Sequence, residues 1–425
     1  MTAEGFVALA VALVTILTTA RLLGVLARRL GQPPVIGEIL GGILLGPTLA
    51  DGAVTRALFP LEVRPAMTVL ADVGICVFMV FVGLHVDRGL LRGHGRIMST
   101  ISISAVVVPF LAGVLLASVL ADRHADGGGL VFTLFMGAAL ACTAFPVLAR
   151  ILRDRDLLDT PIGGLALACA ALDDVLIWSL LAVVAAIAGA GTDPARVLLV
   201  VPMVVVLLTV VRPLTKRWLR RHPMDGILPG CLLFVFLAAG ATACSLATDW
   251  MGLHLIFGAF MFGVAMPEGG AAFLRERVLP KVERGTETLL IPVFFASAGI
   301  GVDLSTVDLV GLGEFGLILL AAVGGKGIGG YVGARICGVR RRHSAVLSIL
   351  LNTRGLTELI LLNVGVQIGV LDADLYSLMV VMALVTTAMT GALLRVVYPP
   401  AVACLDRRGA GRVGDNPAEH DRARS

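Results

Sequence analysis

The chain has 425 residues, of which 57% are hydrophobic and only 15% are charged, and its mean hydropathy is +0.94. This composition excludes an ordinary soluble domain and predicts a protein that crosses a membrane several times. The formal net charge is +4, and most basic residues fall in short connections between apolar segments, so the sequence gives no indication of nucleic-acid binding.

A transmembrane helix needs about 20 apolar residues to cross a hydrocarbon core of about 30 Å. The sequence contains thirteen such segments, and we therefore predict an all-α polytopic membrane protein with about thirteen transmembrane helices. In chain order the predicted segments are 5–27, 33–50, 66–86, 98–121, 130–151, 161–189, 195–214, 227–247, 251–267, 286–302, 309–335, 343–369 and 374–398.

Arginine and lysine gather on alternate connections, as at Arg28 and Arg29 and again at 340–342. Cytoplasmic loops of membrane proteins are enriched in basic residues. We therefore expect the N-terminus outside and the C-terminus in the cytoplasm, with the chain in the cytoplasmic membrane. The opposite connections hold only Arg56, Arg64, Arg123 and Arg196.

Two apolar segments share a spaced motif. VFMVFVGLHVD (77–87) and VFFASAGIGVD (293–303) have Val-Phe, then Gly83 or Gly299, then Val-Asp in the same register. The two segments are seven predicted helices apart, and because seven is odd they cross the membrane in opposite senses. Inverted repeats of this kind are common in secondary transporters. A looser match relates Gly37 and Gly42 to Gly258 and Gly263.

The repeat sets the expected domain organisation. We predict one transmembrane domain over 1–404, with inverted repeats at about 5–189 and 227–398 and a linking helix at 195–214. The tail, 405–425, is short and charged, and is expected to be disordered.

The fifth segment is expected to break near its middle. Pro146 in ALACTAFPVLAR (139–150) has no N–H, which frees backbone carbonyls near Cys142 and Thr143. Broken helices in inverted-repeat transporters expose carbonyls that coordinate small cations. Cys142, Thr143 and Pro146 are thus candidate residues of an ion site.

The sixth segment carries two adjacent acidic residues, Asp173 and Asp174, near its centre, where the free-energy cost of placing a charge in the membrane is highest. One acid at the middle of a membrane helix costs about 3 kcal/mol on insertion scales, so two in succession need partners or a task. Adjacent helical residues point about 100° apart, so each acid faces different neighbours. The alternative is a purely structural pair, neutral when protonated and satisfied by hydrogen bonds.

The eleventh segment contains Lys326 within AAVGGKGIGGYVG, whereas the other two lysines lie in loops. A buried lysine in a chain rich in arginine suggests a group that gains and loses a proton, because arginine stays charged. Its expected counter-ion is one of the two acids of the sixth segment.

The twelfth segment, the repeat mate of the fifth, is interrupted by polar residues in LLNTRGLTELILLN (350–363). We expect a second discontinuous helix here that crosses the first, with Thr353 as a further crossover ligand. Arg354 and Glu358 stand at i and i+4, where they either neutralise each other or support the charge of the site. The corresponding residues to the acidic pair in the thirteenth segment are Thr386 and Thr387.

Seven segments, in order, resemble the monovalent cation:proton antiporters of the Kef, plant CHX and bacterial Nap/Nha type. They are GQPPVIGEILGGILLGP (31–47), FVGLHVD (81–87), ACTAFPVLARIL (141–152), ALDDVLIW (171–178), GLHLIFGAFMFGVAMP (252–267), GGKGIGG (324–330) and LNTRGLTELILLNVG (351–365). The resemblance covers nearly the whole chain.

The resemblance implies a thirteen-helix antiporter fold, usually dimeric, in which a core of crossed helices moves against a dimerisation domain. It assigns cation and proton binding to Asp174, places Asp173 at the variable preceding position, matches Lys326 to the lysine of the ion pair, and puts Thr143 beside the ion. The monovalent cation would then be held by Asp174, Asp173 and Thr143.

We therefore expect a secondary antiporter that exchanges Na⁺ or K⁺ for protons, with H⁺ and the cation competing for the carboxylates. Asp173 and Lys326 together predict electrogenic exchange, because Lys326 offers a place for a second proton. Two alternatives stay open, a gated cation channel and a proton-coupled exporter of an organic solute. The sequence has no nucleophile–base set and no metal-ligand spacing among its seven cysteines, so we expect neither an enzyme nor a cofactor.

Overall fold

The computed structural model describes residues 3–399, apart from gaps at 49–51, 61, 86–90, 126–128, 159, 189–195, 197, 222–226, 252, 254, 268–284, 286–288 and 306. The described part of the chain is helical and contains no strand. The predicted tail, 405–425, lies outside the described residues, as does the beginning of the predicted linking helix.

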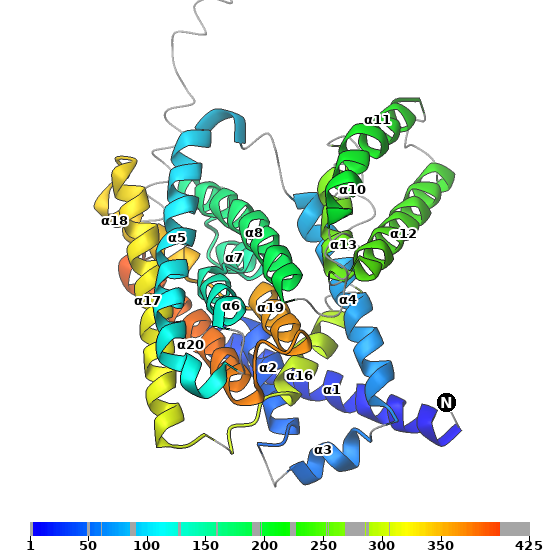
Figure 1. Ribbon diagram of the computed structural model, residues 1–425, viewed down its shortest axis with the longest axis vertical. Coiled ribbons are helices and arrows are strands. Elements are labelled where there is room, and N and C mark those ends of the chain that lie inside the picture. The colour runs from blue at the N-terminus through cyan, green and yellow to red at the C-terminus, as the bar shows by residue number, and fades with distance from the viewer. Residues whose placement is uncertain are drawn as a thin grey trace, which may run out of the picture.

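The helices follow one another in the order that the apolar segments predict (Figure 1). Their bounds are α1 Ala3–Arg29, α2 Pro34–Leu45, α3 Ala53–Leu58, α4 Arg64–His85, α5 Leu91–His124, α6 Gly129–Ala141, α7 Phe145–Asp154, α8 Pro161–Ile187, α10 Val200–Val206, the π-helical η2 Leu207–Val211, α11 Arg212–Arg221, α12 Ile227–Trp250, α13 Leu255–Ala265, α16 Ile291–Ile300, α17 Leu309–Ile336, α18 Arg341–Leu351, α19 Leu356–Gln367 and α20 Ala373–Val397.

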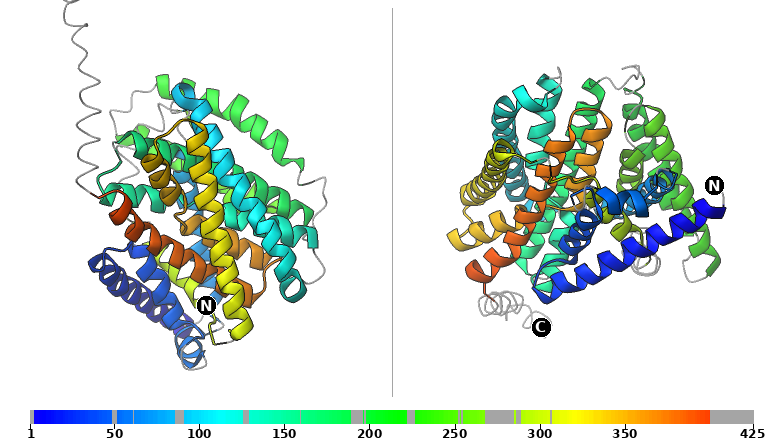
Figure 2. Two further views of the ribbon diagram at one scale, coloured as in Figure 1. Left: turned by 90° about the vertical axis from the view of Figure 1, so that its left-hand side faces the viewer. Right: turned by 90° about the horizontal axis from the view of Figure 1, so that it is seen from below.

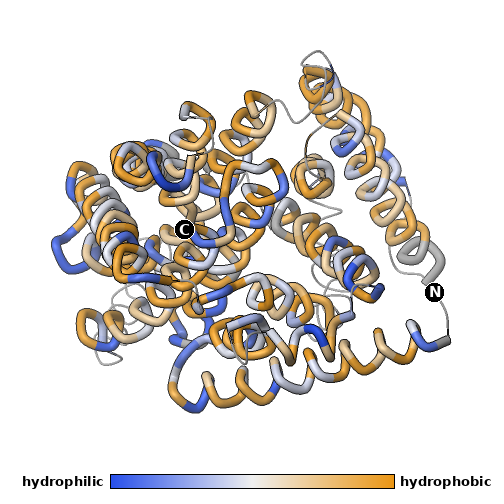
Figure 3. The backbone as a smooth tube through the Cα atoms, turned by 60° about the horizontal axis from the view of Figure 1, so that its bottom comes forward, coloured by the Kyte–Doolittle hydropathy of each residue, from blue (hydrophilic) through white to orange (hydrophobic). Residues whose placement is uncertain are grey.

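Each predicted segment overlaps at least one helix, and the all-helical membrane fold is confirmed. Among the described residues seven helices are long and apolar enough to cross a membrane, and the bent pair α18 and α19 would make an eighth. Four further apolar helices, α2, α6, α13 and α16, are shorter than a full span. The count of thirteen transmembrane helices therefore stays a prediction. Hydrophobic residues dominate the helices, as Figure 3 shows.

Apart from α10, η2 and α11, the helices form two groups that lie side by side (Figures 1 and 2). We call α5–α8 together with α17–α20 the core group, because α17 packs along α5 and α18, and α8 packs against α5, α6, α7 and α18. The second group, called the flanking group, comprises α1–α4, α12, α13 and α16, in which α13 packs on α4 and α12 and α16 packs on α2. Both buried acids of α8 thus lie in the core group.

Two close helix contacts in the flanking group relate the predicted repeats. A Cβ on Gly42 of α2 would collide with the Ala296 carbonyl of α16 beside Gly299, so only glycine permits this approach. At the corresponding contact, Gly263 of α13 faces Gly83 of α4 with the same restriction. The sequence match pairs Gly42 with Gly263 and Gly299 with Gly83, so each repeat supplies one glycine to each contact. Equivalent contacts of this kind are expected between inverted repeats. The boundaries of the two repeats stay a prediction.

One end of the core group is fixed by ion pairs. His124 of α5 lies 2.6 Å from Asp372 and 3.3 Å from Glu314, which joins the α5 end to the beginnings of α20 and α17. Asp308 accepts the Gly311 N–H at the start of α17, and this hydrogen bond, with Arg123, lowers the pKa of the Asp308 carboxyl. These contacts hold the two helices that carry Lys326 and Thr387 in register with α5.

Candidate functional site

The site forms where two interrupted helices cross. The helix α6 ends at Ala141 and α7 begins at Phe145, so the predicted break before Pro146 is confirmed. The second pair, α18 and α19, is separated by 352–355 and bends by 43°. The two breaks meet directly, since the Ala144 N–H donates to the Thr353 carbonyl at 2.9 Å. The structure thus contains the two discontinuous crossing helices that the sequence predicts.

Arg354 compensates the carbonyl end of the first broken helix. Its guanidinium is fully buried and donates to the carbonyls of Ala139 and Leu140, at 2.9 and 2.7 Å. It also pairs with the Glu358 carboxylate at 2.7 Å, as the i, i+4 spacing predicts. The last carbonyls of a helix carry a partial negative charge and lack intrahelical partners. Arg354 therefore stabilises the end of α6 as well as neutralising Glu358.

One carboxylate oxygen of Asp173 belongs to a hydrogen-bond network with Lys326 and Thr143. The Lys326 ammonium donates to the Thr143 hydroxyl at 2.6 Å and lies 3.3 Å from the Asp173 carboxylate. The Thr143 hydroxyl oxygen is 2.9 Å from Asp173 and 3.1 Å from the Leu351 carbonyl, two acceptors for its single proton. All three side chains are fully buried. This network links α8, α17 and both helix breaks.

Asp174 has a different environment from its neighbour. Its side chain is 1% exposed, yet neither carboxylate oxygen has a hydrogen-bond partner among the described residues. A buried polar group without a partner is costly, and such groups in native proteins usually have a functional reason. The two acids therefore have separate environments, one paired with Lys326 and Thr143 and the other without a hydrogen-bond partner among the described residues.

The remaining candidate residues lie at the breaks. Cys142 is buried and its thiol lies 3.5 Å from the Thr357 hydroxyl. Thr353 is buried, and its hydroxyl has no hydrogen-bond partner in the described part of the chain. Pro146 lies in the first turn of α7. The structure thus gathers all of these residues at one crossing, although Thr143 contacts Asp173 and not Asp174.

Thr387 is a site residue to which sequence reasoning gave no role. Its hydroxyl accepts the Arg354 N–H at 3.3 Å and lies 2.7 Å from the Arg354 carbonyl. Thr387 therefore links α20 to the break between α18 and α19. In the same way Asp173 links α8 to the break between α6 and α7 through Thr143. The sequence did contain a signal for Thr387, because Thr386 and Thr387 occupy the positions in the second repeat that correspond to Asp173 and Asp174 in the first.

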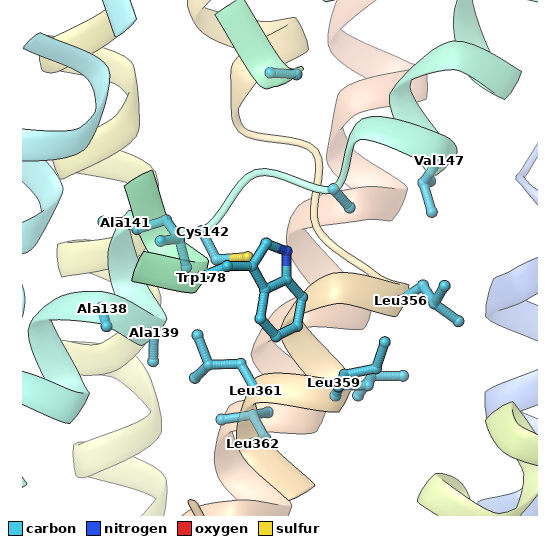
Figure 4. Packing of buried hydrophobic residues seen from close by; sticks show 14 of the residues in the cluster. Ala138, Ala139, Ala141, Cys142, Val147, Trp178, Leu356, Leu359, Leu361 and Leu362 are labelled. Atoms are coloured by element: carbon cyan, nitrogen blue, oxygen red, sulfur yellow. The ribbon is translucent and has the colours of Figure 1, made fainter. Parts of the chain in front are cut away.

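Apolar side chains enclose the crossing (Figure 4). Trp178 of α8, Cys142, and Leu359 and Leu361 of α19 belong to one cluster of buried residues. Trp178 follows Asp174 by four residues, a spacing that places both on the same helix face, and sequence reasoning also missed it. Its indole nitrogen has no hydrogen-bond partner among the described residues.

The Thr143 network makes a first prediction. Replacing Thr143 by Val removes a hydroxyl that contacts both Asp173 and Lys326. Under the cation exchange that the sequence resemblance implies, we expect a higher KM for the cation with a smaller change in maximal rate. We also expect a loss of stability of about 1–3 kcal/mol, the range for a buried donor or acceptor left unpaired. Thr143→Ser, which keeps the hydroxyl, is the control and should behave like wild type. An unchanged KM across pH in Thr143→Val would remove Thr143 from the site.

Comparisons with known proteins agree on one family. The family model described as "Sodium/hydrogen exchanger, transmembrane" matches residues 13–398. The chain is 36% identical over 399 residues to the Na⁺/H⁺ antiporter NhaS4 of Synechocystis, covering 91% of this chain and 96% of that protein. It is 38% identical over 400 residues to cation/H⁺ antiporter 17 of Arabidopsis thaliana, covering 91% of this chain and 48% of that protein.

A yeast relative and a solved structure extend the comparison. K⁺/H⁺ antiporter 1 of Saccharomyces cerevisiae is 31% identical over 417 residues, with 92% of this chain and 46% of that protein covered. The chain thus spans about half the length of these plant and yeast relatives. The sodium proton antiporter MjNhaP1 of Methanocaldococcus jannaschii superposes with a TM-score of 0.65 at 15% identity, over 94% of this chain and 98% of that one. The superposition therefore shows that the two chains share a fold.

Proposed function

Since this chain belongs to the sodium/hydrogen exchanger family of membrane cation/proton antiporters, we propose that it exchanges Na⁺ or K⁺ for protons at Asp174. The family consists of transporters, so the chain is not an enzyme. The relatives' names differ in their cation, sodium for NhaS4 and potassium for the yeast protein, and both ions are therefore candidates.

One observation carries the assignment of Asp174. It is a buried carboxylate without a hydrogen-bond partner among the described residues, beside a crossing of two broken helices. A hard monovalent cation prefers oxygen ligands, and a deprotonated carboxylate supplies one together with a compensating charge. When the carboxylate binds a proton instead, the site is neutral and crosses the membrane without the cation. Competition for Asp174 therefore couples the two fluxes.

The two helix groups provide the movement that exchange needs. In inverted-repeat transporters one bundle rocks against the other around a fixed site. Here the acids, Lys326 and both broken helices lie in the core group, so the core group carries the ion past the flanking group. The repeats at about 5–189 and 227–398 would then exchange roles between the two membrane faces, with 195–214 as the link.

Assembly and orientation complete the proposal. We place the protein in the cytoplasmic membrane as a homodimer in contact with lipid, with its N-terminus outside and its C-terminus in the cytoplasm. The alternating basic connections support this orientation. The flanking group, which lacks the ion site, is the part available for the dimer interface.

A proton-sensitive dye in everted vesicles tests the exchange. Added Na⁺ or K⁺ should reverse the dye quenching that a respiratory proton gradient produces, because each cation that moves is exchanged for protons. A gated channel would give no such reversal without a counter-flow of another ion. An exporter of an organic solute would respond to that solute and remain indifferent to both cations.

We further propose that exchange is electrogenic, with Lys326 carrying a second proton. Lys326 keeps its proton beside the Asp173 carboxylate, 3.3 Å away. A cation that arrives at the two carboxylates weakens the attraction between Asp173 and the ammonium, which then releases its proton. Two protons would then move against one cation, and net charge would cross the membrane.

This stoichiometry predicts a response to voltage. Wild-type protein in liposomes should exchange faster when a valinomycin-set potential pulls net positive charge inward, since 100 mV is worth about 2.3 kcal/mol per charge. The matched variant Asp173→Asn with Lys326→Gln removes both charges of the pair together and should lose the voltage response while exchange continues. A wild-type rate indifferent to the imposed potential would show that exchange is electroneutral and that the pair is structural.

A further inference from the structure

The indole N–H of Trp178 is a buried donor without a partner. The side chain is 3% exposed, and the indole nitrogen has no hydrogen-bond partner within the described part of the chain. Tryptophan N–H groups that are buried usually find an acceptor, because leaving a polar group dry and unpaired is costly. An acceptor that binds only during the transport cycle would explain this arrangement.

The nearest unsatisfied acceptor along α8 is Asp174, one helical turn earlier. Side chains on a helix tilt toward its N-terminus, so a side chain at position 178 covers the preceding turn, which begins at Asp174. Residues at i and i+4 are neighbours on one helix face. Both carboxylate oxygens of Asp174 lack partners among the described residues, so the two groups are too far apart for a direct hydrogen bond. In Figure 4 the indole nitrogen lies on the side of the two interrupted segments.

The indole ring of Trp178 packs against an aromatic side chain of α13. Phe257 of α13 packs on Trp178 edge to face, with ring centroids 5.9 Å apart and planes at 84°. Cys142 and several residues of α19 belong to the same buried cluster as Trp178 (Figure 4). Edge-to-face aromatic contacts hold a ring more firmly than apolar burial alone. In this conformation the N–H direction is therefore set by packing within the protein.

We infer that Trp178 is a positioning residue of the cation site, whose N–H holds a water molecule that completes the coordination shell of a cation bound at Asp174. The indole N–H is only a donor, so this group cannot be a direct ligand of a cation. A water oxygen has two lone pairs, one that accepts the indole N–H and one that faces the cation. Bridging waters of this kind are nearly as favourable as direct hydrogen bonds. The transported species is then a partly hydrated monovalent cation.

This inference rests on the proposed function, and the variant Trp178→Phe tests it. Phenylalanine keeps an aromatic ring against Phe257 but removes the donor, so the KM for the cation should rise about fivefold, the effect of one hydrogen bond, with little change in maximal rate. The matched control is Trp250→Phe, the same change at an exposed position of α12, which should leave KM unchanged. Phe257→Leu, which alters the packing and keeps the donor, should raise KM less than Trp178→Phe.

Fluorescence gives a second readout that does not need Trp178 to be replaced. The chain has three tryptophans, so Trp218→Phe with Trp250→Phe leaves Trp178 as the only one. Added Na⁺ or K⁺ should shift its emission with a midpoint equal to the KM for exchange, and Asp174→Asn in this background should abolish the shift. An unchanged emission while exchange saturates, or an unchanged KM in Trp178→Phe, would overturn the inference about Trp178 alone. Exchange by Asp174→Asn would instead overturn the proposed function.

Discussion

Replacing Asp174 by Asn should reduce cation-dependent proton flux to background and leave the protein folded in detergent. Asparagine has nearly the same size as aspartate, but it cannot trade a proton for a cation. Asp174 has no hydrogen-bond partner among the described residues, so its replacement by a side chain of similar size breaks no hydrogen bond between helices. Reconstituted protein and a proton-sensitive dye measure the flux, and size-exclusion chromatography in detergent measures the fold.

The adjacent acid provides the control. Asp173→Asn with Lys326→Gln neutralises a neighbouring acid on the same helix together with its counter-ion, so no buried charge is left unpaired. This double variant should still exchange cations for protons. Loss of exchange there, together with retained exchange in Asp174→Asn, would reverse the roles that we assign to the two acids.

Replacing Arg354 by Leu should have the largest effect on stability. The change leaves the Glu358 carboxylate buried without its partner and removes the donors that satisfy the Ala139 and Leu140 carbonyls. Breaking a buried ion pair by removing one member costs about 3–5 kcal/mol. Thermal unfolding in detergent should show this loss. The end of α6 would lose its compensating charge, so the remaining folded protein should also exchange more slowly.

Two control variants separate charge from general damage. Arg341→Leu changes an exposed arginine at the start of α18 and should leave stability close to that of wild type. Arg354→Leu with Glu358→Leu removes both charges and should recover part of the loss, leaving the two carbonyls as the remaining defect. Equal stability of Arg354→Leu and wild type would show that the ion pair does not hold the crossing.

Much of this site could be predicted from sequence because its signals are local. A proline inside an apolar segment predicts a helix break from the missing N–H, and the break lies before Pro146 as expected. Charged residues within apolar segments are costly enough to mark the site by themselves, as Asp173, Asp174 and Lys326 do. The i, i+4 spacing of Arg354 and Glu358 also predicted their ion pair.

What could not be predicted depends on how helices are turned and placed. Adjacent acids point about 100° apart, but only the packing of α8 decides that Asp173 faces Lys326 while Asp174 does not. The carbonyl acceptors of Arg354 are more than 200 residues away in sequence, and backbone acceptors have no residue-type signature. Hydropathy also could not define where short helices end. The helix α2 ends at Leu45, before Gly46 and Pro47, although the apolar segment continues to residue 50.

Proton release on cation binding is the measurement that tests the central claim most directly. Purified protein in a weakly buffered detergent solution is titrated with Na⁺ and with K⁺ while the pH is recorded. If Asp174 binds the proton and the cation in turn, wild type should release protons as the transported cation saturates it, and Asp174→Asn should release none from this site. Saturable cation binding without proton release in wild type, or equal release in Asp174→Asn, would contradict competition at this carboxylate.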